Sequence, residues 1–114
     1  MLEDMYKALG GDYNEVMLRI PSEALIRRFA GKFLDDTSFQ DLEKGLESQD
    51  WESAFRAAHT LKGVALNLGF GNLCRAASAL TEALRSREPL TDFSLYDNVK
   101  AAYEQTVDAI RASL

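Results

Sequence analysis

Apolar residues recur every three or four positions along most of the chain, and strictly alternating apolar and polar runs are nearly absent. This spacing places apolar side chains on one face of an α-helix, whereas a half-buried strand would alternate. Glycine, proline and helix-capping residues divide the chain into successive helical segments. The segments predicted in this way are 2–9, 13–19, about 23–34, 37 or 38 to 48, 51–68, 71–86, and 92–94 to almost 114.

The lengths of these segments predict an all-α fold. Four longer amphipathic helices joined by short links are typical of an antiparallel four-helix bundle, and the shorter N-terminal helices are expected to pack across one end of it. Asp12, Ser22 and Asp50 each precede a segment and are predicted N-caps. Residues 1–114 are expected to form a single domain, because this length suits one core.

Composition excludes several classes of function. The formal charge is −5, from 18 acidic and 13 basic residues, with no block of Lys or Arg. This argues against binding to nucleic acid or to an anionic membrane. The single cysteine, Cys74, cannot close a disulfide within the chain, and no segment resembles a signal peptide or a membrane span. We therefore expect a soluble, cytoplasmic monomer.

The only histidine, His59, lies within the segment 51–68. At about 100° per residue, His59 falls about 140° from the centre of the predicted core sector of that helix, so its side chain is expected to be exposed. Trp51 borders the core sector on one side, and Ala57 and Val64 on the other. The sector itself comprises Ala54, Ala58, Leu61, Ala65 and Leu68.

Four residues share the helix face of His59: Phe55, Lys62, Gly63 and Leu66. Phe55 and Leu66 are predicted to form a modest exposed apolar patch, which is typical of a docking surface. Lys62 would place a mobile cation near anything negative that approaches the ring. Gly63 weakens the helix but leaves space beside the imidazole for a partner.

These residues also allow plainer interpretations. A single histidine on a helix is most often incidental, and Phe55 and Leu66 could belong to a wide core covered by the N-terminal helices. The chain shows no zinc-ligand pattern, no nucleophile matched to His59 as in a hydrolase triad, and no phosphate-binding loop, since "LGFGNL" lacks the required spacing. No metal site or cofactor is expected.

The stretch "AHTLKGVALNLG" resembles the signature of histidine-containing phosphotransfer (HPt) domains. Four further stretches are similar to segments of that family, so that the resemblance covers roughly residues 9 to 113. Val64 and Thr81 depart from the pattern, which often has a small polar residue and a glutamine there. The four stretches are "ALGGDYNEVMLRI", "LIRRFAGKFLDD", "LEKGLESQDWESAFRAAHTLKG" and "LCRAASALTEAL".

The resemblance implies a four-helix bundle whose exposed histidine exchanges a phosphoryl group with aspartates of receiver domains. By this comparison His59 is the phospho-acceptor, Lys62 an electrostatic partner of the phosphoryl oxygens, and Gly63 the clearance beside the ring. Because the chain has no Asp cluster placed for Mg²⁺, the ion and its acidic pocket are expected on the receiver. Such a protein is a phosphoryl carrier rather than a stand-alone enzyme.

Two other interpretations stay open from the sequence. One is the phospho-accepting domain of a chemotaxis-type histidine kinase, which shares the bundle and the exposed histidine. The other is a helical adaptor that docks through Phe55 and Leu66 and is never phosphorylated.

Overall fold

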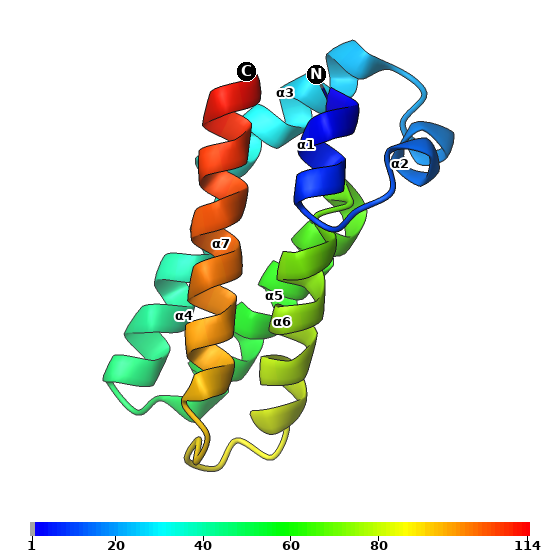
Figure 1. Ribbon diagram of the computed structural model, residues 1–114. Helices are drawn as coiled ribbons and strands as arrows, with labels where there is room; N and C mark the ends of the chain where they lie inside the picture. The colour runs from blue at the N-terminus through cyan, green and yellow to red at the C-terminus, as the bar shows by residue number, and fades with distance from the viewer. Residues whose placement is uncertain (1) are drawn as a thin grey trace.

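The computed structural model describes residues 2–114, and this part of the chain is helical, without strands (Figure 1). The all-α prediction is confirmed. The helices are α1 (Leu2–Ala8), α2 (Tyr13–Arg19), α3 (Glu23–Phe33), α4 (Ser38–Glu47), α5 (Trp51–Leu68), α6 (Gly71–Ala83) and α7 (Ser94–Ser113).

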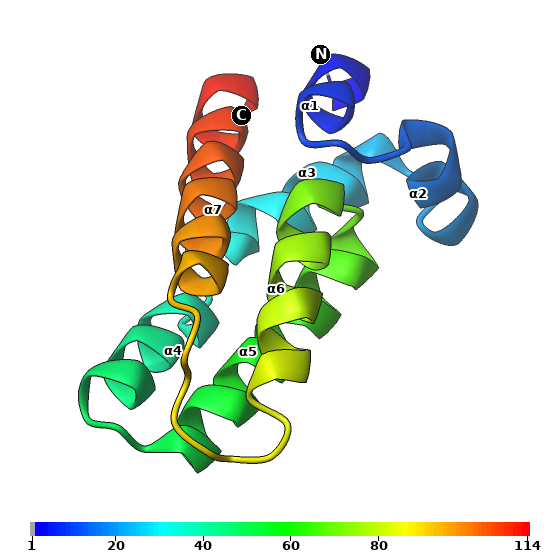
Figure 2. The ribbon, with the colours of Figure 1, turned by 60° about the horizontal axis from the view of Figure 1, so that its bottom comes forward.

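The helices α4 to α7 form the predicted antiparallel four-helix bundle. Along the chain, α4 packs against α5, α5 against α6, and α6 against α7, and both ribbon views show the four side by side (Figures 1 and 2). Aromatic rings join α4 to α7. Phe39 stacks on Tyr103 with ring centroids 4.2 Å apart, and the Tyr96 hydroxyl donates a hydrogen bond to Glu43. The bundle is thereby closed around a common core.

The three N-terminal helices lie at the end of the bundle where α5 turns into α6 (Figures 1 and 2), as the sequence predicts. The Tyr6 hydroxyl donates a hydrogen bond of 2.7 Å to the carbonyl of Leu68, and burial raises the pKa of that phenol to about 12. Phe33 meets Phe70 edge to face, with centroids 5.3 Å apart. These contacts anchor α1 to the last residue of α5 and α3 to the turn between α5 and α6.

The three predicted N-caps are confirmed. The Asp12 carboxylate accepts hydrogen bonds from the amides of residues 14 and 15, the Ser22 hydroxyl from that of residue 25, and the Asp50 carboxylate from that of residue 53. Each satisfies an amide that the first helical turn leaves without a carbonyl partner. At its other end α5 stops at Gly69, whose left-handed φ of 77° suits a residue without a side chain.

Helix α6 ends at Ala83, three residues before the predicted end at Ser86. After Ala83 the backbone amides of Leu84, Arg85 and Arg87 bond carbonyls three residues back, so the chain tightens out of the α-helix. Arg87 then adopts a left-handed φ of 59°. The hydrophobic pattern continues through this turn, because Leu84 is still buried, and the pattern alone therefore overestimates the helix.

Helix α3 buries Ile26, Ala30 and Phe33 but leaves Leu25 and Phe29 substantially exposed. The sequence places Leu25, Ile26, Phe29 and Phe33 on one side of this helix, and the structure divides that side between the core and the surface.

None of the helices formed by residues 2–114 is long and apolar enough to cross a membrane.

Candidate functional site

The inner face of α5 agrees with its predicted core sector. The sector residues are buried, apart from Leu68, which is half-buried and packs against the core. Trp51 and Val64 are half-buried at the edges. Helix α5 is therefore oriented as its periodicity predicts, and this orientation decides which side chains reach the surface.

His59 lies near the middle of α5, and its side chain is exposed, as predicted. Within residues 2–114 no side-chain hydrogen bond involves His59, and the nearby ones join Ser53 to Asp50 and Arg56 and Arg87 to Glu52. The only aromatic neighbour of the imidazole in that range is Phe55, whose ring centroid is 6.0 Å away. An exposed imidazole without a hydrogen-bond partner is free to meet an incoming group.

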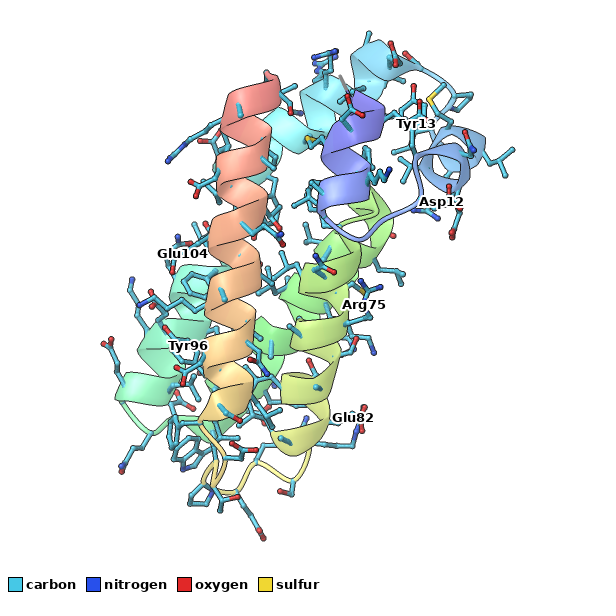
Figure 3. The ribbon with its side chains drawn as sticks, viewed as in Figure 1. Asp12, Tyr13, Arg75, Glu82, Tyr96 and Glu104 are labelled. Carbon is cyan, nitrogen blue, oxygen red and sulfur yellow. The ribbon has the colours of Figure 1, made fainter. Side chains whose placement is uncertain are left out.

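Lys62 is half-buried one turn beyond His59. Its charge reaches Glu82 of the neighbouring helix α6. The pKa of the Glu82 carboxyl is lowered mainly by the hydrogen bonds it accepts from Arg85 and additionally by the positive charge of Lys62. Glu82 projects outward from α6 (Figure 3).

Gly63 borders open space. A Cβ built on this residue meets no atom of another residue within 4 Å, so the glycine serves no close contact between helices. Leu66, one turn further along α5, is 57% exposed despite its large apolar side chain. We refer to His59, Lys62, Gly63 and Leu66 together as the His59 face.

Phe55 does not belong to this exposed face, and the prediction that it forms an exposed patch with Leu66 is wrong. Its side chain is only 8% exposed. The guanidinium carbon of Arg87 lies 3.8 Å from the centroid of its ring, and that of Arg85 lies 5.9 Å away. The connection between α6 and α7 therefore covers Phe55, which a helical wheel of α5 alone cannot show.

A charged cluster beside Phe55 was not predicted from the sequence. Glu52 pairs with Arg56 on its own helix and with Arg87 beyond α6, each at 2.8 Å. Because of these two arginines, Arg87 first, the pKa of the Glu52 carboxyl is lowered. The four-residue spacing of Glu52 and Arg56 is a recognisable sequence signal, whereas the contact with Arg87 spans 35 residues and has none.

The two positions that depart from the HPt pattern are not equivalent in the structure. Thr81 is fully buried, and its hydroxyl donates a hydrogen bond of 2.6 Å to the carbonyl of Ala77. Thr81 therefore presents no side chain to the surface. Val64 is half-buried and, with Phe29 and Leu68, lines a groove between α3 and α5. Among residues 2–114, no group of three or more His, Cys, Asp or Glu side chains could hold a metal ion.

Within residues 2–114 the fold is thus a helical bundle that exposes its histidine on α5, one turn from a lysine. The chain matches the family model of the Hpt domain over residues 32–113, which is more than half of its length, and it belongs to that family. Helices α1 and α2 and most of α3 lie outside the matched range. Comparisons with curated proteins and with solved structures find no significant match.

Membership of the Hpt family states the function in general terms. Hpt domains transfer phosphoryl groups in His–Asp phosphorelays and interact there with receiver domains, so the chain takes part in two-component signal transduction.

Proposed function

We propose that this protein is a phosphoryl carrier whose acceptor is His59. The observation that carries the proposal is that the only histidine of the chain is exposed in the middle of α5 and has no hydrogen-bond partner among residues 2–114. A phosphohistidine intermediate requires an imidazole that a partner can reach. Within this chain no other residue offers that side chain.

In the proposed step, the lone pair of the His59 Nε2 atom attacks the phosphorus of an aspartyl phosphate on a receiver domain. The N–P bond forms as the bond between phosphorus and the aspartate oxygen breaks, and the carboxylate leaves with the electron pair. A neutral imidazole suits this role near pH 7, and transfer depends mainly on positioning and charge neutralisation. The reverse step returns the group to the aspartate of another receiver. The divalent cation and the acidic residues that bind it belong to the receiver.

The other residues of the His59 face support this step. Lys62 follows His59 by three residues on α5, so the two side chains share a face and the ammonium group can turn toward phosphoryl oxygens. Open space beside Gly63 lets a receiver bring its aspartate near the ring. Leu66 supplies an exposed apolar contact at the same face.

The test is phosphorylation of the purified chain by phosphoramidate and by phosphorylated receiver domains from the same organism. We expect an acid-labile phosphate on wild-type protein and none on His59→Gln. The exposed position should leave the free energy of unfolding within about 0.5 kcal/mol of wild type. Undiminished phosphorylation of a folded His59→Gln variant would remove His59 from the proposal.

Docking at Leu66 can be tested separately. Leu66→Asp should weaken transfer from a phosphorylated receiver while leaving phosphorylation by the small donor unchanged. Leu114→Asp is the matched control, since Leu114 is similarly exposed, at 51%, but lies at the far end of α7. If both variants behave alike with the receiver, Leu66 is not part of the docking surface.

The same experiments separate the two alternative functions. A helical adaptor would bind receivers without acquiring acid-labile phosphate. A phospho-accepting domain of a chemotaxis-type kinase would be phosphorylated most rapidly by an ATP-binding kinase domain rather than by a receiver.

A further inference from the structure

Arg87 holds an unusual backbone conformation next to the site. Its φ of 59° lies in the left-handed region, which costs free energy for a residue with a Cβ. Among residues 2–114, only Gln49 shares this conformation without being glycine. Such a conformation persists only where other contacts outweigh its cost. The Arg87 side chain makes three contacts that can do so.

The Arg87 side chain reaches from the α6–α7 connection onto α5. Its guanidinium carbon lies 3.8 Å from the centroid of the Phe55 ring, which is the geometry of a cation–π contact. Its Nε donates a hydrogen bond of 2.8 Å to a Glu52 carboxylate oxygen. Its Nη1 donates a third contact, a hydrogen bond of 2.6 Å to the carbonyl of Arg85, which lies within the α6–α7 connection. One planar group thus binds an aromatic ring and a carboxylate together.

Phe55 transmits this contact toward His59. The two rings lie four residues apart on α5, with centroids 6.0 Å apart and an angle of 30° between their planes. This offset arrangement is a favourable one for aromatic rings. Phe55 is only 8% exposed, with Arg87 against its ring and the rest of the side chain packed in the core, so the phenyl ring has few alternative rotamers. The Phe55 ring therefore neighbours both Arg87 of the loop and the imidazole of His59, and we refer to these three residues as the stack.

We propose that Arg87 is a positioning residue, which acts through Phe55 to restrict the orientation of the His59 imidazole at the surface. The inference rests on the proposed role of His59 as phospho-acceptor. An exposed histidine would otherwise sample several rotamers, and only some direct Nε2 toward an incoming phosphorus. Because the stack limits the rotamers of the imidazole before a receiver docks, less conformational entropy is lost in the transfer step.

The first experiment measures the imidazole without any phosphate. Because His59 is the only histidine, histidine-labelled protein gives one set of ring signals in NMR spectra. Arg87→Ala should shift the His59 ring resonances and increase the rotamer averaging seen in side-chain couplings. Arg111→Ala, which removes an exposed arginine from the last turn of α7, is the matched control and should leave them unchanged.

Two further variants separate the contacts of Arg87. Glu52→Gln removes the charge of the ion pair but keeps the guanidinium over the ring, so we expect a smaller change in the His59 signals. Phe55→Leu retains apolar volume without an aromatic ring, and it should free the imidazole even with Arg87 present. The Phe55 variant also tests the stack if Arg87→Ala proves too unstable to study.

The second experiment measures transfer. With Arg87→Ala, phosphorylation of His59 from a phosphorylated receiver should fall roughly tenfold, and Arg87→Lys should recover part of the loss because it retains a cation over the ring. Unchanged His59 signals, or unchanged transfer in a folded Arg87→Ala variant, would overturn the proposal and leave Arg87 as a loop anchor only. If wild-type protein takes up no phosphate at His59, the proposed function fails, while the NMR comparison still decides whether the stack restricts the ring.

Discussion

Gly45 of α4 and Ala54 of α5 bring two helix backbones into contact. A Cβ on Gly45 would lie 2.8 Å from the backbone nitrogen of Ala54 and 2.9 Å from its Cα, which is closer than real Cβ atoms approach. The contact exists only because one residue lacks a side chain and the other has a single methyl group. It fixes the distance between the helix that carries His59 and its neighbour.

Gly45→Ala should therefore destabilise the bundle. Replacing a helical glycine with alanine normally gains about 1 kcal/mol, but here overpacking against rigid backbone, at up to about 3 kcal/mol, should outweigh that gain. Urea unfolding measures the difference. Gly31→Ala in α3 is the control, because its Cβ would meet only Leu114 at an ordinary 3.7 Å. A gain in stability from Gly45→Ala equal to that from Gly31→Ala would contradict the backbone contact.

The fold follows from local signals that the sequence contains. Asp12, Ser22 and Asp50 predict helix starts because a capping carboxylate or hydroxyl acts on amides two or three residues away. Gly69 predicts the end of α5 for an equally local reason. The end of α6 is less predictable, because the buried Leu84 continues the hydrophobic pattern after the backbone has already left the helix.

Asp50 gives a prediction about pH. Hydrogen bonds from the Ser53 hydroxyl and amide lower the pKa of the Asp50 carboxyl in the folded protein below its ordinary value of 3.8. A lowered folded pKa means that the carboxylate stabilises the fold above that value and that this contribution is lost as pH falls through the folded pKa.

Asp50→Ala should accordingly lower the melting temperature at neutral pH, and the difference from wild type should shrink in acid below the ordinary carboxyl pKa. Thermal unfolding followed by circular dichroism across this range measures both effects. Asp50→Asn, which keeps an acceptor without a titrating group, should recover part of the stability at neutral pH. A difference between wild type and Asp50→Ala that persists undiminished in acid would show that the charge of Asp50 does not contribute.

The site is predictable from sequence only as far as α5 extends. Helical periodicity predicts that His59 is exposed and Leu61 buried, because the burial of each depends only on which face of α5 it occupies. Part of the cover of Phe55 comes from Arg87, which follows it by 32 positions and belongs to a loop. Contacts between distant segments carry no periodic signal, so the arginine that covers Phe55 emerges only from the three-dimensional structure.

Lys62→Ala should slow phosphoryl transfer or shorten the lifetime of phosphohistidine without abolishing acceptance. Lys62 is partly exposed, so its electrostatic contribution should be about 1 kcal/mol, or roughly fivefold in rate. Rapid-quench transfer assays and the decay of phosphorylated protein measure the two quantities. Lys100→Ala, at an exposed position on α7, is the control. Unchanged transfer and unchanged lifetime would make Lys62 an ordinary surface charge.

Gly63→Gln tests whether the open space beside the imidazole serves a partner. Since nothing lies within 4 Å of a Cβ at this position, the variant should fold normally and become more stable by a few tenths to about 1 kcal/mol. The new side chain would project over the preceding turn toward His59, where a receiver has to bring its aspartate for in-line attack. Transfer from a phosphorylated receiver should fall sharply.

Comparison of two donors identifies the cause of that loss. Phosphoramidate needs far less room than a receiver domain, so its reaction with the Gly63→Gln variant should be affected much less. Gly63→Ala adds a single methyl group and should gain similar stability with little loss of transfer. If the receiver phosphorylates Gly63→Gln at the wild-type rate, the space beside Gly63 does not admit the partner. If both donors slow equally, the glutamine disturbs the imidazole itself, and steric clearance for a receiver is not the reason for glycine at this position.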